Sequence, residues 1–311
     1  MKEITDYRPQ KVDKGMVQQL FYTLYSPEPE NIRATILVIH GMQEHSGRYN
    51  ELAHYLVKQG FVVLTYDHIG HGKTATTEND LGFFQLHQPD RQLVNDAENM
   101  ADYVEKLYPA VPHFVLGHSM GSFVARCLLQ QAGTRFSGAI LVGTGGKTKV
   151  APLARFIFTV LNAICPRRRT FFNTVFIQMH NKRFRKEPNC DETNWLSSNK
   201  ANRVAFQQDS LCGVPFTING FYTLLSLNVK ATQRDWAKTI SKDLPFLFLS
   251  GADDPIGDFG DGVWQTAEHL EVDGFKDVSS RVYFVMRHEI LQEEIKLKVF
   301  QYIEEWISEH L

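Results

Sequence analysis

The sequence alternates between short apolar runs and longer segments with helical spacing, and this alternation is what most constrains its fold. Strands covered on both faces are typically apolar at nearly every position. Six runs have this character: residues 34–41, 61–67, 113–119, 138–143, 244–251 and 281–286. The intervening segments repeat their apolar residues every three or four positions, as amphipathic helices do. The alternation predicts an α/β fold with a mostly parallel, doubly wound sheet, and we expect the first thirty residues to add antiparallel edge strands.

The alternation is interrupted once, after Gly143. Residues 145–240 contain no run that indicates a buried strand, and they are rich in aromatic and basic residues. We therefore expect a mainly helical insertion, or cap, over a core formed by residues 1–144 and 241–311. Ligands of open α/β sheets bind beyond the carboxyl ends of the strands, so an insertion that follows a strand is expected to lie at the ligand-binding edge.

The segment GHSMG, residues 117–121, stands where a predicted strand ends and a helix begins. Gly-x-Ser-x-Gly in this context is the nucleophile-elbow pattern, whose tight turn leaves no room for side chains two residues before and after the serine. The turn would project Ser119 Oγ into the open above a helix N-terminus, whose free N–H groups can stabilise a developing oxyanion. The alternative is a plain glycine-rich turn, and partners elsewhere in the chain decide between the two.

A serine hydroxyl needs a neighbouring base, and in this fold the acid and then the histidine follow the serine in the chain. Three histidines lie beyond residues 244–251: His269, His288 and His310. His310 is the penultimate residue, and His269 lies within a helical segment. His288 directly follows the predicted strand at 281–286, at the same edge as the serine. The sequence therefore favours His288 as the base over a merely capping or ion-pairing histidine.

The acid is expected just past residues 244–251, where SGADDPIGDFGD contains four aspartates. Asp253 and Asp254 are the candidates, and spacing alone leaves the choice open. The oxyanion hole needs two backbone N–H groups, one from the residue after the nucleophile and one from the loop after an early strand. Met120 and Met42 occupy these two positions, the latter within HGMQEHSGRY.

Three segments, HGMQEHSGRY, YDHIGHGKT and GHSMG, occur in this order and spacing. In combination they resemble the monoacylglycerol lipase and lysophospholipase branch of the α/β-hydrolases, which includes proteins described as serine-aminopeptidase-like. The resemblance runs over about residues 20–145 and resumes at FLSGADDPIG and RHEIL. The segment NWLSSNKANRVAFQQDSLCGVPFT, in the insertion, resembles the caps of bacterial members named as lysophospholipases.

The resemblance implies the α/β-hydrolase fold with an inserted helical cap, and it implies a catalytic triad of Ser119, Asp254 and His288. It selects Asp254 because the acid of this family falls three residues past a strand-ending glycine, here Gly251. It also implies that Met42 and Met120 provide the oxyanion hole.

The activity implied by the resemblance is hydrolysis of the carboxylic ester of a monoacyl lipid, a monoacylglycerol or a lysophospholipid, through an acyl-enzyme. A short-chain carboxylesterase or an aminopeptidase of the same fold is the alternative among hydrolases. A non-catalytic ligand-binding protein of this fold is the alternative from another class, and the complete Ser/Asp/His set argues against it. Ten apolar residues of the insertion would wall an acyl channel or seal the core of the cap: Phe156, Ile157, Phe158, Val160, Leu161, Phe171, Phe172, Val175, Phe176 and Ile177.

For other polar residues near these motifs, the sequence favours a structural role. Asp67, His68 and His71 do not have the spacing of a known metal-ligand set, so we expect neither a metal nor another cofactor. His118, beside the serine, is expected to be structural. A hydrogen-bonded scaffold for the oxyanion loop is predicted for four residues: His40, Glu44, His45 and Arg48.

Composition limits the partners and the location. The formal net charge is −2, so no overall field favours nucleic acid. The four scattered cysteines indicate a reducing compartment, and the polar start MKEITDYRPQ does not resemble a signal peptide. We expect a cytoplasmic protein, peripheral at the inner membrane face. Between Gly145 and Lys200 there are 11 Lys and Arg against 3 Asp and Glu, so the expectation for the cap is contact with an anionic membrane or a solvated basic face.

Overall fold

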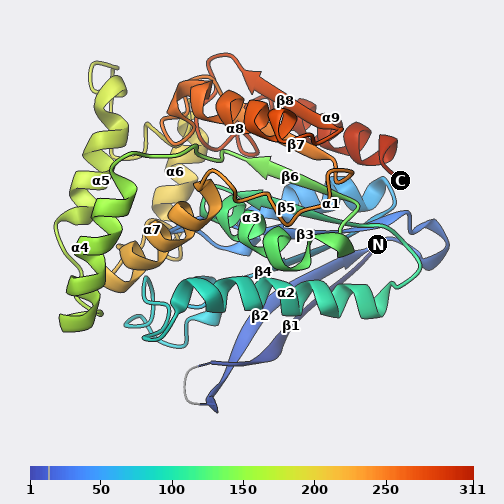
Figure 1. Ribbon diagram of the computed structural model, residues 1–311, viewed down its shortest axis with the longest axis horizontal. Helices are drawn as coiled ribbons and strands as arrows, with labels where there is room; N and C mark the ends of the chain where they lie inside the picture. The colour runs from blue at the N-terminus through green and yellow to red at the C-terminus, as the bar shows by residue number, and fades with distance from the viewer. Residues whose placement is uncertain (13–14) are drawn as a thin grey trace.

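An eight-stranded sheet forms the centre of the computed structural model, which describes residues 1–12 and 15–311 (Figure 1). The strand order is β1-β2-β4-β3-β5-β6-β7-β8. β1 pairs antiparallel with β2, β2 pairs antiparallel with β4, and all other neighbours are parallel. The strands are β1 Lys2–Lys11, β2 Val17–Ser26, β3 Ala34–Ile39, β4 Phe61–Tyr66, β5 His113–His118, β6 Gly138–Val142, β7 Phe246–Gly251 and β8 Val278–Tyr283. The predicted α/β fold and the antiparallel edge strands at the start of the chain are confirmed.

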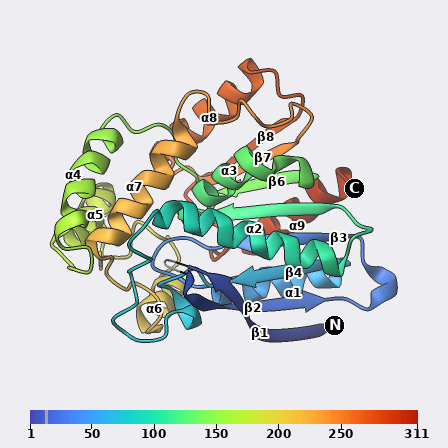
Figure 2. The ribbon, with the colours of Figure 1, turned by 60° about the horizontal axis from the view of Figure 1, so that its bottom comes forward.

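Helices cover both faces of the sheet, as the alternation of the sequence requires (Figure 2). The helices are α1 Asn50–Lys58, α2 Pro89–Leu107, α3 Met120–Ala132, α4 Ala151–Ile164, α5 Phe172–His180, α6 Lys200–Gln208, α7 Ile218–Thr232, α8 Asp261–Val272 and α9 Lys296–Glu309. Buried side chains of α2, α3, α7 and α8 pack with one face of the sheet, and those of α1 and α9 with the other. The central strands β3 to β7 are therefore buried from both sides, which explains their continuous apolar runs.

The last predicted strand is displaced in the structure. β8 pairs with β7 from Val278 opposite Phe246 to Tyr283 opposite Gly251, so its pairing stops where β7 ends. The apolar residues Phe284 and Val285 therefore lie in a turn and are 87% and 66% exposed. The prediction of a buried strand at 281–286 is wrong in its bounds, since β8 spans Val278–Tyr283. It is also wrong in burial, because β8 is the edge strand of the sheet.

Residues 145–240 contribute α4, α5, α6 and α7. Both views show α4 and α5 together at one end of the molecule, beyond the carboxyl ends of the parallel strands (Figures 1 and 2). α7 lies against α4 on one side and against α3 on the other, so it joins this segment to the sheet layer. The division into a core and a cap with bounds at 145 and 240 stays a prediction.

The turn between β5 and α3 positions the serine. Ser119 has φ 53° and ψ −120°, a backbone conformation that is rare outside glycine. A Cβ at Gly117 would lie 2.4 Å from the carbonyl oxygen of Gly121. A Cβ at Gly121 would lie 2.1 Å from the carbonyl oxygen of Ile39, at the end of the neighbouring β3. The two glycines therefore let α3 start directly against the sheet edge.

Gly121→Ala is expected to destabilise the fold by about 3 kcal/mol, because the clashing atoms are backbone and cannot move aside. Urea unfolding followed by circular dichroism measures this difference. Gly133→Ala, at the other end of α3, is the matched control: its added Cβ meets nothing closer than 3.7 Å. A Gly121→Ala protein as stable as the Gly133→Ala protein would contradict the close approach of α3 to β3.

Candidate active site

The structure brings together three of the predicted residues at the carboxyl edge of the sheet. His288 Nε2 lies 2.8 Å from Ser119 Oγ, and His288 Nδ1 lies 3.0 Å from each carboxylate oxygen of Asp254. All three are buried, with 6%, 2% and 0% exposure for Ser119, His288 and Asp254. With Nδ1 donating to the carboxylate, Nε2 is left to accept the serine proton, which is the arrangement of a general base beside a nucleophile.

The geometry separates the two aspartates that spacing left open. Asp254 faces His288, and its carboxylate also accepts hydrogen bonds from the Ile256 amide at 2.8 Å and from Ser250 Oγ at 3.2 Å. Asp253 instead points outward and pairs with Arg183 at 3.2 Å. Of the two, Asp254 is therefore the one in contact with the imidazole.

Backbone amides near Ser119 define where an oxyanion could bind. The amide of Gly41 donates to Glu44, that of Gln43 donates to His71, and that of Ser119 donates to the Val142 carbonyl. Within the described residues, the amides of Met42 and Met120 donate to no protein acceptor. Met42 and Ser119 both line the small cavity at the serine, and Met120 begins α3.

Glu44 organises the loop that carries Met42. Its buried carboxylate accepts hydrogen bonds from the Gly41 amide at 2.6 Å, the Tyr49 hydroxyl at 2.8 Å and Arg48 at 3.2 Å, and it lies 3.0 Å from His118 Nδ1. Burial alone would raise its pKa, but the hydrogen bond and charge of His118, together with Arg48, hold the pKa of Glu44 well below its usual range. Glu44 is therefore a buried anion.

His118 extends this network to the base. The charge of Glu44 and its hydrogen bond overcome the effect of burial and raise the pKa of His118. Its other ring nitrogen, Nε2, lies 3.3 Å from the carbonyl oxygen of His288. Through Glu44 and His118, the oxyanion loop, the serine turn and the loop of His288 share one set of hydrogen bonds.

A second buried cluster of polar side chains lies next to the loop that carries Met42. His40 Nε2 accepts from the His68 amide at 3.0 Å, and the rings of His40, His68 and His71 lie within 6.1 Å of one another. Asp67 accepts from the amides of Ser46 at 2.8 Å and Lys73 at 2.7 Å, so both carboxylate oxygens are occupied. The hydrogen bonds of this cluster fit a structural turn.

The cap closes over the serine. Trp195, Leu196 and Phe206 line the cavity beside Ser119, whose volume is about 20 Å³, close to that of one water molecule. The Trp195 ring lies 5.2 Å from the ring of His288. An acyl chain does not fit this space.

The apolar residues expected to wall an acyl channel lie elsewhere. Phe158 packs against Phe172 and Phe221, within the core shared by α4 and α7. Five others are exposed on the outer side: Phe156, Ile157, Val160, Phe171 and Val175. None of the ten lines the small cavity at the serine, and the expectation that they wall an acyl channel stays a prediction.

Sequence reasoning missed several residues around the site. Trp195 and Phe206 come from the cap, and their motif NWLSSNKANRVAF gave no sign of which side chains face the serine. Glu289 also escaped notice, although it directly follows His288. Its carboxylate pairs with Arg48, and its amide donates to the Leu196 carbonyl at 2.8 Å, which ties the base loop to the cap.

The chain is similar in sequence to known proteins along most of its length. A family model described as "Serine aminopeptidase, S33" matches residues 30–295. The chain belongs to this family. It is 28% identical to a monoglyceride lipase of Mus musculus over 295 residues, which is 94% of this chain and 88% of that protein. It is 23% identical to a monoacylglycerol lipase of Mycolicibacterium smegmatis, with 94% of each protein covered.

Solved structures show the same fold. A highly thermostable carboxyl esterase from Bacillus coagulans, in complex with glycerol, has a TM-score of 0.89 and 26% identity to this chain, with 98% of each covered. A soluble variant of monoglyceride lipase from Saccharomyces cerevisiae has a TM-score of 0.76 and 20% identity, covering 99% and 96% of the two chains. The predicted resemblance to the α/β-hydrolases and their monoacylglycerol lipase branch is confirmed. Across the described residues, no helix is both long and apolar enough to span a membrane.

The buried histidines make the stability of the folded state depend on pH. Burial lowers the pKa of His68 to about 3 and that of His71 to about 4, against 6.5 for a free side chain. The neutral forms therefore stabilise the folded state fully above pH 6.5, and this contribution is lost as pH falls from 6.5 toward 4. We expect the melting temperature to fall steadily over this window, and a His68→Gln protein to show a shallower fall.

Differential scanning calorimetry at a series of pH values measures this slope. His54→Gln is the matched control, because the His54 side chain is 41% exposed. The slope of the control should equal that of the unmodified protein. Equal slopes in all three proteins would show that the His68 site does not carry the acid dependence.

Proposed function

We propose that this protein hydrolyses the ester of a monoacylglycerol through an acyl-enzyme, with Ser119 as nucleophile, His288 as general base and acid, and Asp254 as the orienting carboxylate. The observation that carries the proposal is the continuous contact from Ser119 Oγ to His288 Nε2 at 2.8 Å and from His288 Nδ1 to Asp254 at 3.0 Å. The substrate class rests on the monoglyceride lipases that match along nearly the whole chain.

In the proposed reaction, Ser119 Oγ attacks the ester carbonyl while His288 Nε2 takes the serine proton. The tetrahedral oxyanion then accepts hydrogen bonds from the amides of Met42 and Met120, which donate to no protein acceptor in the described residues. His288 returns the proton to the leaving glycerol oxygen. Water then attacks the acyl-enzyme while His288 takes its proton, and His288 gives that proton to Ser119 Oγ as the fatty acid leaves. Asp254 holds the imidazole so that Nε2 is free to act.

Residues 145–240 act in this proposal as the cap that admits the lipid. The closed cavity requires Trp195, Leu196 and Phe206 to separate from Ser119 before the ester can reach it. These side chains are apolar, so in the open state they would contact the acyl chain rather than water.

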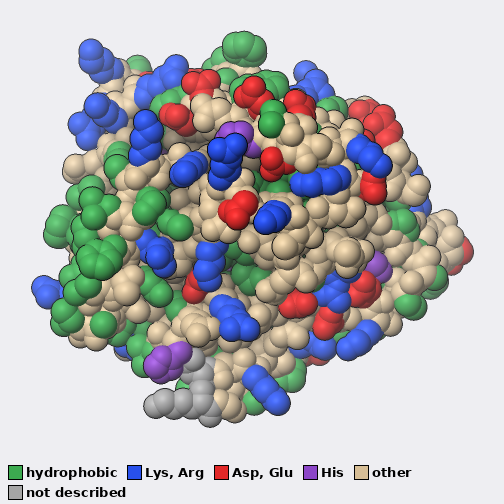
Figure 3. Space-filling model, in the orientation of Figure 1, with side chains coloured by type: hydrophobic (Ala, Val, Ile, Leu, Met, Phe, Trp, Pro, Cys, Tyr) green, Lys and Arg blue, Asp and Glu red, His purple; other side chains and the backbone are tan. Residues whose placement is uncertain are grey.

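We also propose that the outer side of the cap contacts an anionic membrane. Figure 3 shows hydrophobic side chains gathered over α4 and α5, with Lys and Arg around them. The exposed apolar residues are Leu153, Phe156, Ile157, Val160, Ile164, Phe171, Val175 and Met179. Apolar side chains can enter the lipid interface while neighbouring basic groups contribute about 1 kcal/mol each near anionic headgroups.

Two of the three adjacent arginines of the cap have other contacts. The Arg167 guanidinium lies over the ring of Phe83, and Arg169 donates to the carbonyls of Glu78 and Leu81. These two side chains hold the cap against the loop before α2. The outer face of α4 is therefore the better place to test membrane contact.

Asp254→Asn is expected to lower kcat for monoacylglycerol hydrolysis about 10⁴-fold, because the amide favours the wrong imidazole tautomer. Ser119→Ala should lower it about 10⁴- to 10⁶-fold and abolish labelling by a fluorophosphonate probe. Fatty-acid release from a monoacylglycerol, a lysophosphatidylcholine and a series of p-nitrophenyl esters measures activity and chain preference together.

Asp253→Asn is the matched control for the acid, since this neighbour pairs with Arg183 instead of His288. It should retain most of the activity. A larger loss in Asp253→Asn than in Asp254→Asn would exchange their roles. The unmodified protein could be labelled by the fluorophosphonate probe yet hydrolyse no lipid ester, and act only on short esters or aminoacyl substrates. That result would overturn the proposed substrate class.

The membrane contact predicts binding to phosphatidylglycerol vesicles at about 20 mM salt and release near about 500 mM, because salt screens the basic groups. Phosphatidylcholine vesicles should bind far less. Replacing Phe156 and Val160, which are 66% and 48% exposed, by Gln should weaken binding without lowering hydrolysis of a soluble short-chain ester. Co-sedimentation measures the bound fraction.

Phe284→Gln is the matched control, because this side chain is more exposed than Phe156 but lies beside β8, away from the cap. It should bind vesicles as the unmodified protein does. No binding at low salt would dismiss the membrane contact, and unchanged binding of the Phe156/Val160 variant would exclude the outer face of α4.

A further inference from the structure

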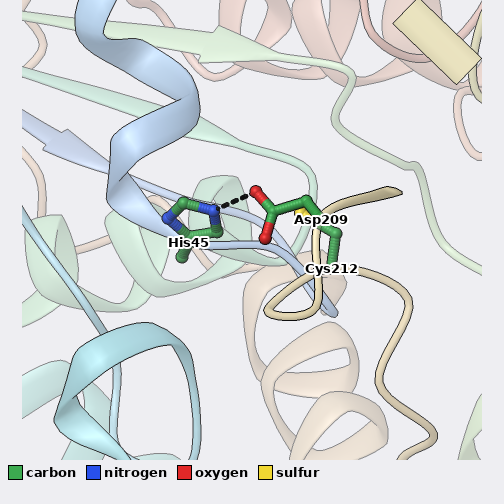
Figure 4. Close-up of side chains that lie close together, drawn as sticks. All are labelled: His45, Asp209 and Cys212. Carbon is green, nitrogen blue, oxygen red and sulfur yellow. Dashed lines mark hydrogen bonds and ion pairs between the residues drawn. The ribbon is translucent and has the colours of Figure 1, made fainter. Parts of the chain in front are cut away.

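Three side chains with metal-binding atoms meet where the cap touches the oxyanion loop (Figure 4). His45 lies in the loop between β3 and α1, and Asp209 and Cys212 lie in the loop after α6. His45 Nε2 and Asp209 Oδ2 are 2.8 Å apart, and the ligand atoms of all three residues lie within 4.8 Å of one another. The proposed ester hydrolysis uses none of these side chains.

We propose that His45, Asp209 and Cys212 form a binding site for Zn²⁺ that links the cap to the oxyanion loop. An imidazole nitrogen, a thiolate sulfur and a carboxylate oxygen are the ligand types that Zn²⁺ takes in proteins, and three of them with a water complete a tetrahedral site. With Zn–N and Zn–O near 2.0 Å and Zn–S near 2.3 Å, the ligand atoms of such a site are about 3.5 Å apart. The His45–Asp209 separation of 2.8 Å is shorter than this value, and the separations that involve Cys212 are at most 4.8 Å, so the side chains complete the site by rotating around the ion.

The protons and charges balance when the ion binds. Cys212 loses its thiol proton to solvent, and the Nε2 proton of His45 moves to Nδ1 by exchange with water. His45 Nδ1 then gives up the hydrogen bond that it accepts from the Gly47 amide, which is already long at 3.2 Å. The charge of Zn²⁺ is neutralised by the Cys212 thiolate and the Asp209 carboxylate. The site is therefore neutral after binding, whereas the Asp209 carboxylate alone gave it a single negative charge before.

The site is accessible and its surroundings suit a cation. His45 and Asp209 also line an open groove between the cap and α1, with a volume of about 440 Å³, through which an ion can reach the cluster. Two buried carboxylates, Glu44 and Glu289, lie nearby and both pair with Arg48, and Glu44 also lies 3.0 Å from His118. Together with Asp209, three carboxylates therefore lie at this interface.

A metal at this place would resist opening of the cap. The Gly213 amide donates to the Gln43 carbonyl at 2.8 Å, so the loop after α6 already rests on the oxyanion loop beside Met42. Phe206, in α6, lines the closed cavity at Ser119. Bonds from Zn²⁺ to His45 on one side and to Asp209 and Cys212 on the other would hold Phe206 over the serine. Zn²⁺ is therefore expected to slow hydrolysis of a lipid ester, an effect that rests on the proposed function, whereas binding itself does not.

Cobalt is the first probe, because a Co²⁺–thiolate bond gives an absorption band in the near ultraviolet that reports ligation by sulfur. The chelator-treated, reduced protein should develop this band on titration with Co²⁺ and lose it when Zn²⁺ is added. Cys212→Ser should show no band, and Asp209→Asn should bind Co²⁺ at least about tenfold more weakly. Cys190→Ser, which removes an exposed thiol in the same cap, is the matched control and should retain the band.

Thermal unfolding provides a second readout that needs no activity. Zn²⁺ should raise the melting temperature of the unmodified protein and of Cys190→Ser by several degrees, and should not raise that of Asp209→Asn or Cys212→Ser. Absence of the cobalt band in the unmodified protein, or its persistence in Cys212→Ser, would overturn the site. If Cys212→Ser does not fold, Asp209→Asn decides alone, and unweakened Co²⁺ binding by that variant overturns the proposal.

Hydrolysis of monoacylglycerol then tests the link to the cap. Zn²⁺ should inhibit the unmodified protein and Cys190→Ser, and should spare Asp209→Asn. Equal inhibition of all three would overturn the link and place the inhibitory ion elsewhere. A protein that shows the cobalt band yet hydrolyses no ester retains the metal site and loses the proposed function, so the two failures are distinguishable.

Discussion

The buried carboxylate of Glu44 is the interaction on which the arrangement of the site depends. It gathers the Gly41 amide, the Tyr49 hydroxyl, Arg48 and His118 around one charge. A buried anion is costly unless it is paired, and removing one partner of such a group typically costs about 3–5 kcal/mol. The loop that carries Met42 therefore has little freedom to adopt another shape. Because His118 also contacts the His288 carbonyl, the same charge fixes the nucleophile turn and the base loop relative to each other.

The sheet and the serine turn could be predicted because their causes are local in the sequence. Continuous apolar runs indicate strands buried on both faces, and Gly117 and Gly121 bracket a turn that excludes side chains. The choice between Asp253 and Asp254 depends on contacts with segments that are distant in the sequence. Both lie in one loop, and the difference is that one faces His288 from the core while the other meets Arg183 from the cap. Spacing contains no information about a partner that arrives from a distant segment, and a family resemblance was needed to select Asp254.

In the cap, the sequence does not predict which side chains are buried and which face the serine. Helical periodicity identifies the apolar face of a helix but not what covers it. In α4, Phe158 is 7% exposed and packs toward α7, whereas Phe156, two residues earlier, is 66% exposed. The residues that do reach the serine, Trp195 and Phe206, belong to a mixed polar segment without a clear period. The same limit applies to β8, where Phe284 and Val285 are apolar but exposed because pairing with β7 has already ended.

The inner and outer sides of the cap differ in a way that bears on its opening. Beside the serine, three polar contacts join the cap to the core: Asn202 with Arg48, Gly213 with Gln43, and Leu196 with Glu289. Water can replace these hydrogen bonds when the cap moves, so they cost little to exchange. Trp195 and Phe206 are different, because opening exposes them to water at about 25 cal/mol per Å² of apolar surface. An acyl chain entering between them removes that cost. In the proposed function, the closed state is thus favoured in water and the open state at a lipid surface, where the exposed face of α4 would already hold the cap.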